Sequence, residues 1–152
     1  MRFWRICRRR YAADGASGEG ARLYGGRWNS RGVRVVYGST SLALAAIETF
    51  VNLEPSLRPK DLVFIVGEIP KGIDILTLDP ATLPINWNRG REESLRKIGD
   101  AWVREGLTAA LLVPSAAIVG EWNVLLNPTH RDFSKIRVEE PQPFEFDLRM
   151  FR

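Results

Sequence analysis

One carboxylate in this sequence stands where a reaction could use it. Leu44, Ile47 and Val51 recur at the spacing that places side chains on one buried face of a helix. Glu48 follows Leu44 by four positions, so its carboxylate lies on or beside that face. A buried charge without a partner is costly. We therefore expect Glu48 to pair with a cation or a hydrogen-bond donor, to act in a reaction, or to reach solvent from the helix edge.

Three further side chains are candidates for contact with a ligand. Arg27 follows Gly25 and Gly26, which let the backbone approach a ligand closely, so it is a candidate partner of the carboxylate, a phosphate clamp or a surface arginine. Tyr37 ends an expected strand and could stack on a base or fill the core. Ser115 follows a buried strand and a proline, where ligand-binding loops often begin, although it could also cap a turn.

The motifs of several common enzyme classes are missing from the sequence. Gly18 and Gly20 match the first two glycines of a dinucleotide fingerprint, but the third glycine is lacking. We find no P-loop, no paired-histidine motif and no Gly-x-Ser-x-Gly elbow. The single Cys7 excludes an internal disulfide, and we expect the lone His130 in a turn rather than as a catalytic base. The sequence therefore predicts no metal site.

Hydrophobic periodicity and turn residues predict the elements that must position these side chains. A Gly-rich loop is expected over residues 15–26. Helices are expected over 41–53, ended by Glu54 and Pro55, and over 92–105, capped by Gly106. Strands are expected over 3–6, 33–37, 62–69, 73–78, 109–113, 136–138 and 144–150. We therefore expect a mixed α/β (α+β) fold over 1–152, a single compact domain with a central mixed sheet flanked by helices.

Composition narrows the class of protein. The 152 residues are 45% hydrophobic and 26% charged, which is typical of a folded domain and not of a disordered chain. Of 22 basic residues 18 are arginine, and the bidentate guanidinium fork favours phosphorylated ligands. The longest apolar stretch, 109–119, is too short to cross a bilayer, and no export signal is evident. We expect a cytoplasmic protein that does not enter the membrane.

Blocks spread over essentially the whole chain match one known family in type and order. The blocks are Arg5 with Arg10-Tyr11-Ala12, Gly18 to Ala21, GGRWN from Gly25 to Asn29, VVYGSTSLALAAIE from Val35 to Glu48, Leu83-Pro84 with Trp87, Gly99 with Trp102, VPSA from Val113 to Ala116, NVLLNPTH from Asn123 to His130, and Phe144 with Phe146-Asp147 and Arg149. In this order they resemble the RES domain family. The chain departs from the family pattern at Gly120, where relatives usually carry proline.

The resemblance implies both a fold and an activity. It implies an ADP-ribosyltransferase-like fold and a toxin of a bacterial type II toxin-antitoxin pair. The expected reaction cleaves the nicotinamide-ribose bond of NAD, by hydrolysis or phosphorolysis, and depletes cellular NAD. The alternative is transfer of ADP-ribose to a specific protein. No cofactor is expected, since NAD is the substrate. The expected partners are an Xre-type helix-turn-helix antitoxin, inorganic phosphate as an acceptor, and further copies of this chain within the toxin-antitoxin complex.

The residues that give the family its name fall on Arg27, Glu48 and Ser115 here, and these are the expected catalytic residues. Cleavage of a glycosidic bond builds positive charge on the ribose, which the Glu48 carboxylate could face while it fixes a ribose hydroxyl. Tyr37 could stack on the nicotinamide ring. Ser115 could hydrogen-bond the nicotinamide amide, a phosphate or the incoming acceptor, and the sequence leaves this choice open.

The remaining expected NAD contacts are cationic or polar. Arg27 could bind the pyrophosphate with Arg5 as a second contact, and Asn123 could contact the ligand or support a residue that does. A different class of function stays open, because the five arginines within 1–10 and Trp4 could form a basic nucleic-acid-binding surface. No RNA- or DNA-binding motif accompanies them.

Overall fold

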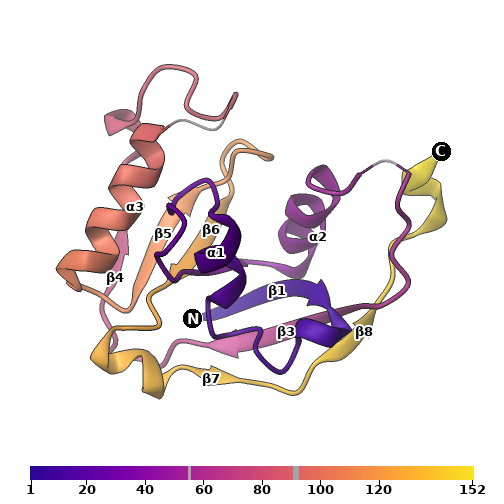
Figure 1. Cartoon of the computed structure of the whole chain (residues 1–152), viewed down its shortest axis with the longest axis horizontal. Coiled ribbons are helices and arrows are strands. Elements are labelled where there is room, and N and C mark those ends of the chain that lie inside the picture. Colours follow the sequence, from indigo (N-terminus) through magenta and orange to yellow (C-terminus); the bar gives the residue numbers. More distant parts are fainter. Residues whose placement is uncertain (55, 91–92) are drawn as a thin grey trace.

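The computed structural model describes residues 1–54, 56–90 and 93–152 (Figure 1). Among these residues, eight strands form one sheet in the order β4-β5-β6-β2-β1-β3-β7, and β8 pairs with β3 beside this path. The strands are β1 (Arg2–Arg8), β2 (Val36–Ser39), β3 (Leu62–Glu68), β4 (Ile75–Thr77), β5 (Ala110–Pro114), β6 (Trp122–Leu126), β7 (Arg137–Val138) and β8 (Gln142–Phe144). The β4-β5 pair is parallel and the others are antiparallel, so the predicted mixed sheet is confirmed.

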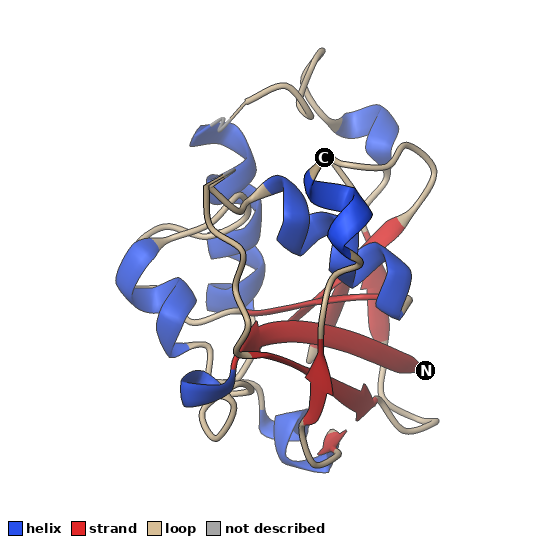
Figure 2. Cartoon of the chain, turned by 90° about the vertical axis from the view of Figure 1, so that its right-hand side faces the viewer, coloured by secondary structure: helices blue, strands red, loops and turns tan. Residues whose placement is uncertain are grey.

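Helices cover this sheet unevenly. The α-helices are α1 (Glu19–Tyr24), α2 (Leu42–Val51) and α3 (Glu93–Glu105), and the short 3-10 helices are η1 (Arg9–Tyr11), η2 (Pro80–Thr82), η3 (Arg131–Lys135) and η4 (Leu148–Phe151). Figure 1 shows α3 beside β5, while α2 lies above β1 at the other side of the molecule. The turned view in Figure 2 shows the helices gathered mainly above the strands.

Two hydrophobic clusters form the core on opposite faces of the sheet. Neighbouring residues of a strand point to opposite faces, and Leu125 belongs to the first cluster whereas Leu126 belongs to the second. The first cluster also contains Trp28 and Leu95, so the segment around Trp28 and helix α3 cover one face. The second contains Phe3 from β1. This packing fixes the Gly-rich N-terminal part of the chain against α3.

The Gly-rich segment contains a helix that the sequence analysis missed. Residues 15–26 were expected as a loop, but α1 spans six of them. Gly18 begins the helix with a φ of 71°, which a glycine adopts without strain. Within the helix, Arg22 Nε donates to the carboxylate of Glu19 at 2.9 Å, and the next residue after the helix, Gly25, also has a positive φ of 70°. Glycine here sets both helix ends rather than preventing a helix.

The expected strand over 144–150 is wrong beyond its first residue. β8 ends at Phe144, and η4 follows at Leu148. Asp147 explains the change, because its carboxylate accepts from the backbone N–H of Arg149 at 2.8 Å and caps η4. The alternating aromatic residues pack with one another: the rings of Phe144 and Phe146 are 5.0 Å apart, and Phe146 and Phe151 are 5.9 Å apart. The alternating phenylalanines therefore belong to an aromatic cluster and not to a β-strand.

Other predicted elements exist with shifted ends. The strand expected over 33–37 is β2 at 36–39, and the one over 73–78 is β4 at 75–77. The helix expected over 41–53 is α2, which ends at Val51, and the predicted stop at Pro55 lies outside the described residues. Glu92, the predicted start of the second helix, lies outside them as well, while Gly106 follows α3 with a φ of 61°, as expected of its cap.

Among the described residues, no helix combines the length and the apolar character that crossing a bilayer requires.

Candidate active site

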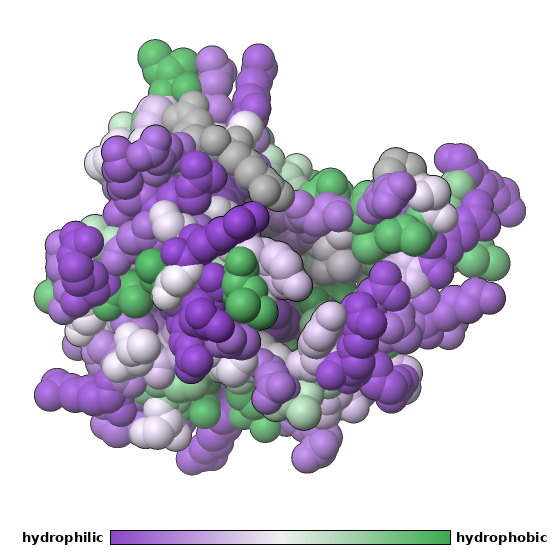
Figure 3. Space-filling view, viewed as in Figure 1, coloured by the Kyte–Doolittle hydropathy of each residue, from purple (hydrophilic) through white to green (hydrophobic). Residues whose placement is uncertain are grey.

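A cavity of about 880 Å³ opens where β1 and β2 separate. The two strands pair at Trp4 and Ser39, and beyond this pair Arg5 Nη1 donates to the backbone oxygen of Tyr37 at 2.9 Å, in place of a ladder bond. The walls come from β1, α1 and the segment after it, β2, α2 and the end of β5. Figure 3 shows this face, with hydrophilic and hydrophobic residues mixed around a hollow right of its centre.

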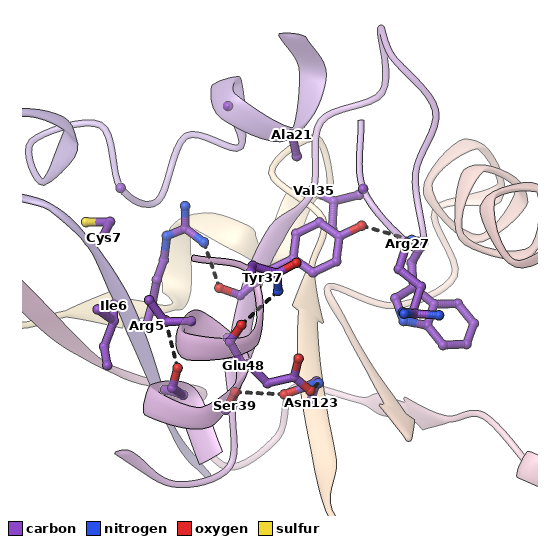
Figure 4. Close-up of a pocket in the computed structure, with 18 of the residues that line it drawn as sticks. Arg5, Ile6, Cys7, Ala21, Arg27, Val35, Tyr37, Ser39, Glu48 and Asn123 are labelled. Carbon is purple, nitrogen blue, oxygen red and sulfur yellow. Dashed lines mark hydrogen bonds between the residues drawn. The ribbon is translucent and has the colours of Figure 1, made fainter. Parts of the chain in front are cut away.

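Glu48 lies in this cavity next to Asn123 (Figure 4), and two neutral donors hold one of its carboxylate oxygens. Ser115 Oγ donates to Glu48 Oε1 at 2.6 Å, and Asn123 Nδ2 donates to the same oxygen at 2.5 Å. Ser39 Oγ donates to Asn123 Oδ1 at 2.7 Å, which turns the amide nitrogen of Asn123 toward Glu48. For Glu48 Oε2, the described residues provide no such bond. The carboxylate is therefore fixed along one edge and open along the other.

Helix α2 aims Glu48 into the cavity because local sequence signals define the helix. Ser41 caps it, since its Oγ accepts from the N–H of Leu44 at 3.1 Å. Leu44 and Ala45 are its buried residues, 3% and 4% exposed, and Glu48 lies one turn further along beside them. Of the alternatives that the sequence left open, the structure supports hydrogen-bond donors as the partners of Glu48. Among the described residues, no arginine pairs with Glu48, and its side chain lies in the cavity rather than at a solvent-exposed edge of the helix.

Ser115 stands behind the carboxylate rather than at the cavity surface. It is 2% exposed, and its neighbours Pro114, Ala116 and Ala117 line the cavity. Its Oγ donates to Glu48 and accepts from the N–H groups of Ala117 at 3.1 Å and Ile118 at 3.0 Å. These contacts use the hydroxyl's hydrogen-bonding capacity. Ser115 is thus placed to hold Glu48, and its hydroxyl is not directed at a ligand.

Tyr37 lines the cavity, and its hydroxyl is already occupied. The hydroxyl donates to Asn29 Oδ1 at 2.6 Å and accepts from the N–H of Trp28 at 3.0 Å. Burial raises the pKa of the Tyr37 phenol, so the group stays neutral at ordinary pH. In Figure 4 the hydroxyl points toward Arg27 and away from Glu48. Tyr37 can therefore offer its ring to a ligand, whereas its hydroxyl fastens the segment at 28–29.

Arg27 lines the cavity beyond Tyr37 and does not pair with Glu48. Its Nη1 donates to two backbone oxygens of a distant loop, that of Trp87 at 3.2 Å and that of Gly90 at 2.6 Å. Hydrogen bonds from its Nε and Nη2 to other described residues are not found. Arg27 therefore fastens this loop to the cavity wall and still has donors available for a ligand.

Arg5 places a second guanidinium in the cavity wall. Among the described residues, its Nε is the buried side-chain polar atom that lacks a hydrogen-bond partner. Burial lowers the pKa of Arg5 below its usual value, which means that the surroundings disfavour its charge in this state. A buried donor without an acceptor is rare and costly. An anionic ligand in the cavity would supply a counter-charge for the Arg5 guanidinium.

The structure thus brings the predicted residues into one cavity but in two groups. Glu48, Ser115 and Asn123 form one hydrogen-bonded cluster, and Arg5 and Arg27 lie in the wall on either side of Tyr37 (Figure 4). Sequence analysis missed Ser39, which is 3% exposed and orients Asn123. Ser39 is the last residue of β2 and lies two positions beyond the strand expected over 33–37, so its place at a strand end was the available signal. No cluster of metal-ligating side chains occurs in the described part of the chain.

Relatives that match almost the whole length of this chain carry toxin names. A sequence from Sphingobium sp. (strain YBL2) named "Prs ADP-ribosylating toxin" is 38% identical over 159 residues, covering 99% of this chain and 96% of that one. A "Toxin Res" from Yersinia enterocolitica is 36% identical over 152 residues, covering 99% of each. Another "Toxin Res", from Photorhabdus laumondii, is 37% identical over 155 residues, covering 100% of this chain and 98% of that one.

A solved structure extends the likeness to three dimensions. In the MbcT-MbcA toxin-antitoxin complex of M. tuberculosis, a chain superimposes with a TM-score of 0.70 at 17% identity, covering 95% of this chain and 84% of that one. At this identity the likeness concerns the fold, and it confirms the predicted mixed α/β class. The family model described as "RES domain" matches residues 2–148. Since that match spans almost the whole chain, this protein belongs to the RES domain family.

Proposed function

We propose that this chain is the toxin of a bacterial type II toxin-antitoxin pair and that it cleaves the nicotinamide-ribose bond of NAD in the cytoplasm. The observation that carries the proposal is the Glu48 carboxylate, fixed on one edge by Ser115 and Asn123 and open on the other, in a cavity that also holds two arginines. The RES domain match and the toxin names of relatives that cover this chain support the same conclusion.

The cavity has the size and the charges that a dinucleotide needs. About 880 Å³ is within the range of small-molecule sites. NAD carries a pyrophosphate, and the guanidinium groups of Arg5 and Arg27, which both line the cavity, could bind its oxygens. The ring of Tyr37 lies between these arginines and could stack on the nicotinamide. No further cofactor is needed, because the bond that breaks is already activated by the cationic nicotinamide.

Glu48 acts at the bond that breaks. When the carbon-nitrogen bond between ribose and nicotinamide breaks, its electron pair stays on the nicotinamide nitrogen. Nicotinamide departs as a neutral molecule, and positive charge develops on the ribose. The open Oε2 of Glu48 accepts a hydrogen bond from a ribose hydroxyl and faces this charge, while Ser115 and Asn123 hold Oε1. An acceptor then adds to the ribose carbon and loses a proton. Because Ser115 and Asn123 are neutral, the negative charge of Glu48 is left for the transition state.

Two classes of acceptor fit this mechanism. Water or inorganic phosphate would make the protein an NAD glycohydrolase or phosphorylase. A protein acceptor would make it an ADP-ribosyltransferase, which is favoured by the printed name of the Sphingobium relative. The mouth of the cavity is also suited to a macromolecule, since Tyr24 and Val51 both line it and are 74% and 59% exposed. An antitoxin partner is supported by the solved toxin-antitoxin complex with this fold. From the resemblance to the RES family, we propose that this partner is of the Xre helix-turn-helix type.

Product analysis with the purified chain tests the proposal. We expect NAD to be converted to nicotinamide and ADP-ribose in buffer, and to nicotinamide and a phosphorylated ADP-ribose when inorganic phosphate is the acceptor.

Expression in bacteria gives a second test. Expression without an antitoxin should arrest bacterial growth as NAD falls, and a cognate antitoxin should prevent this. Labelled cell protein with modest NAD loss would select the protein acceptor. If growth and NAD are the same with wild-type chain and Glu48→Gln, the proposal is wrong, and strongly salt-dependent binding of nucleic acid would then favour the basic-surface alternative.

Arg27→Lys tests the cationic side of the cavity. The change keeps the charge but loses the planar fork, so we expect NAD affinity to fall about tenfold, measured by calorimetry in the Glu48→Gln background to prevent turnover. Arg34→Lys is the matched control, because Arg34 is exposed, pairs with Glu19 at 3.2 Å and does not line the cavity. Equal affinities for both variants would assign Arg27 to loop fastening alone.

A further inference from the structure

The loop at residues 84–90 forms two successive turns beside the cavity. The N–H of Trp87 donates to the oxygen of Pro84 at 3.1 Å, and the N–H of Arg89 donates to that of Asn86 at 2.9 Å. Asn86 has a φ of 62°, in the left-handed region that asparagine tolerates better than most residues. These turns give the loop a defined backbone course between its two attachment points.

The same loop is fastened to the cavity wall by a polar and an aromatic contact. Arg27 Nη1 reaches the oxygens of Trp87 and Gly90, as described above. The ring of Trp87 packs on that of Trp28 with centroids 6.3 Å apart, and Trp28 is only 2% exposed. The two contacts are made by the neighbouring residues Arg27 and Trp28, so they fix the loop relative to this segment. Residues on this loop are therefore held in place before a ligand binds.

Asn88 is the residue of this loop that lines the cavity. It is half-buried, and neither its amide nitrogen nor its amide oxygen makes a hydrogen bond within the described part of the chain. A side-chain amide presents one acceptor and one donor side by side. We propose that Asn88 is a substrate-contacting, specificity-determining residue, whose amide pairs with a planar donor-acceptor edge of the ligand. The proposal rests on the proposed function, since it names part of NAD as that ligand.

NAD has two groups with the required edge. The carboxamide of nicotinamide offers an adjacent donor and acceptor, and the amino and ring-nitrogen edge of adenine does the same, an arrangement that asparagine pairs with in two hydrogen bonds. The shared chemistry is a planar amide-like edge on either half of the dinucleotide. Fragments that lack one half distinguish the two sources: ADP-ribose lacks nicotinamide, and nicotinamide mononucleotide lacks adenine.

Calorimetry in the Glu48→Gln background tests the proposal with NAD, ADP-ribose and nicotinamide mononucleotide. We expect Asn88→Ala and Asn88→Asp to weaken NAD binding about tenfold, because paired hydrogen bonds are lost. A matching loss for ADP-ribose but not for the mononucleotide assigns Asn88 to adenine. The opposite pattern assigns it to the nicotinamide carboxamide, and either pattern supports the proposal.

The control is Ile85→Ala in the same loop. Ile85 is 90% exposed and does not line the cavity, so we expect its NAD affinity and thermal midpoint to match those of the parent. Unchanged NAD affinity in both Asn88 variants would overturn the role of Asn88 and leave the proposed function standing. An equal loss in Ile85→Ala would overturn it too, since any loop change would then suffice. If the parent itself fails to bind NAD or its fragments, the proposed function is what fails, and the role of Asn88 falls with it.

Discussion

Glu48→Gln is expected to lower kcat for NAD cleavage by about 10²- to 10³-fold with little change in NAD affinity. The glutamine oxygen can keep both hydrogen bonds that Ser115 and Asn123 donate to Oε1, at 2.6 and 2.5 Å. Its amide nitrogen then replaces Oε2 at the open edge, so the negative charge is lost while the shape is kept. The missing charge matters most when positive charge develops on the ribose. Single-turnover cleavage and calorimetry separate the two effects.

The matched control for this change is Glu105→Gln at the exposed end of α3, outside the cavity lining. It makes the same chemical substitution, so it should retain wild-type turnover and an unchanged melting temperature. Near wild-type cleavage by Glu48→Gln would remove the carboxylate from the mechanism. If Glu48→Gln lowers the melting temperature as well as kcat, the loss of activity would be explained by damage to α2.

Gly99→Ala should destabilise the fold strongly. A Cβ at Gly99 would lie 1.7 Å from the backbone oxygen of Trp28 and 2.8 Å from its carbonyl carbon. A backbone oxygen cannot rotate away as a side chain can, so α3 and the segment that carries Arg27 must move apart. We expect a loss of about 3 kcal/mol in the free energy of unfolding, and a melting temperature about 10 °C lower. Thermal unfolding followed by circular dichroism measures both.

Gly20→Ala provides the comparison in another helix. Nothing lies within 4 Å of a Cβ placed at Gly20, so the same substitution in α1 meets open space. We expect stability to be unchanged or higher by up to about 1 kcal/mol, because alanine favours a helix over glycine. Similar melting temperatures for Gly99→Ala and Gly20→Ala would show that α3 can shift away from Trp28 without cost.

Where the predictive signal was local, the sequence predicted the structure well. The structure has the predicted cap at Ser41 and buries Leu44, as expected. The predicted buried face does not continue to Val51, which is 59% exposed at the mouth of the cavity. Gly106 ends α3 as expected. Helix caps and helical spacing depend on residues within one or two turns, so they can be predicted without knowing how the rest of the chain folds.

The same local reasoning failed where a pattern had two physical explanations. Glycines at 18 and 25 were interpreted as loop residues but set the ends of α1. The alternation of Phe144 and Phe146 was interpreted as a strand but belongs to an aromatic cluster next to η4. Each pattern is compatible with both structures, and contacts with distant residues decide between them.

Sequence alone determined which chemical groups this protein has, where α2 begins, and that Glu48 lies near its buried side. Only the tertiary structure decided what those groups contact. Ser115 and Asn123 reach Glu48 across 67 and 75 residues of chain, because the sheet register sets Asn123 opposite both Ser39 and Val113. Arg27 reaches Gly90 across 63 residues. Contacts of this kind depend on how strands pair and helices pack, which short-range spacing along the chain does not encode.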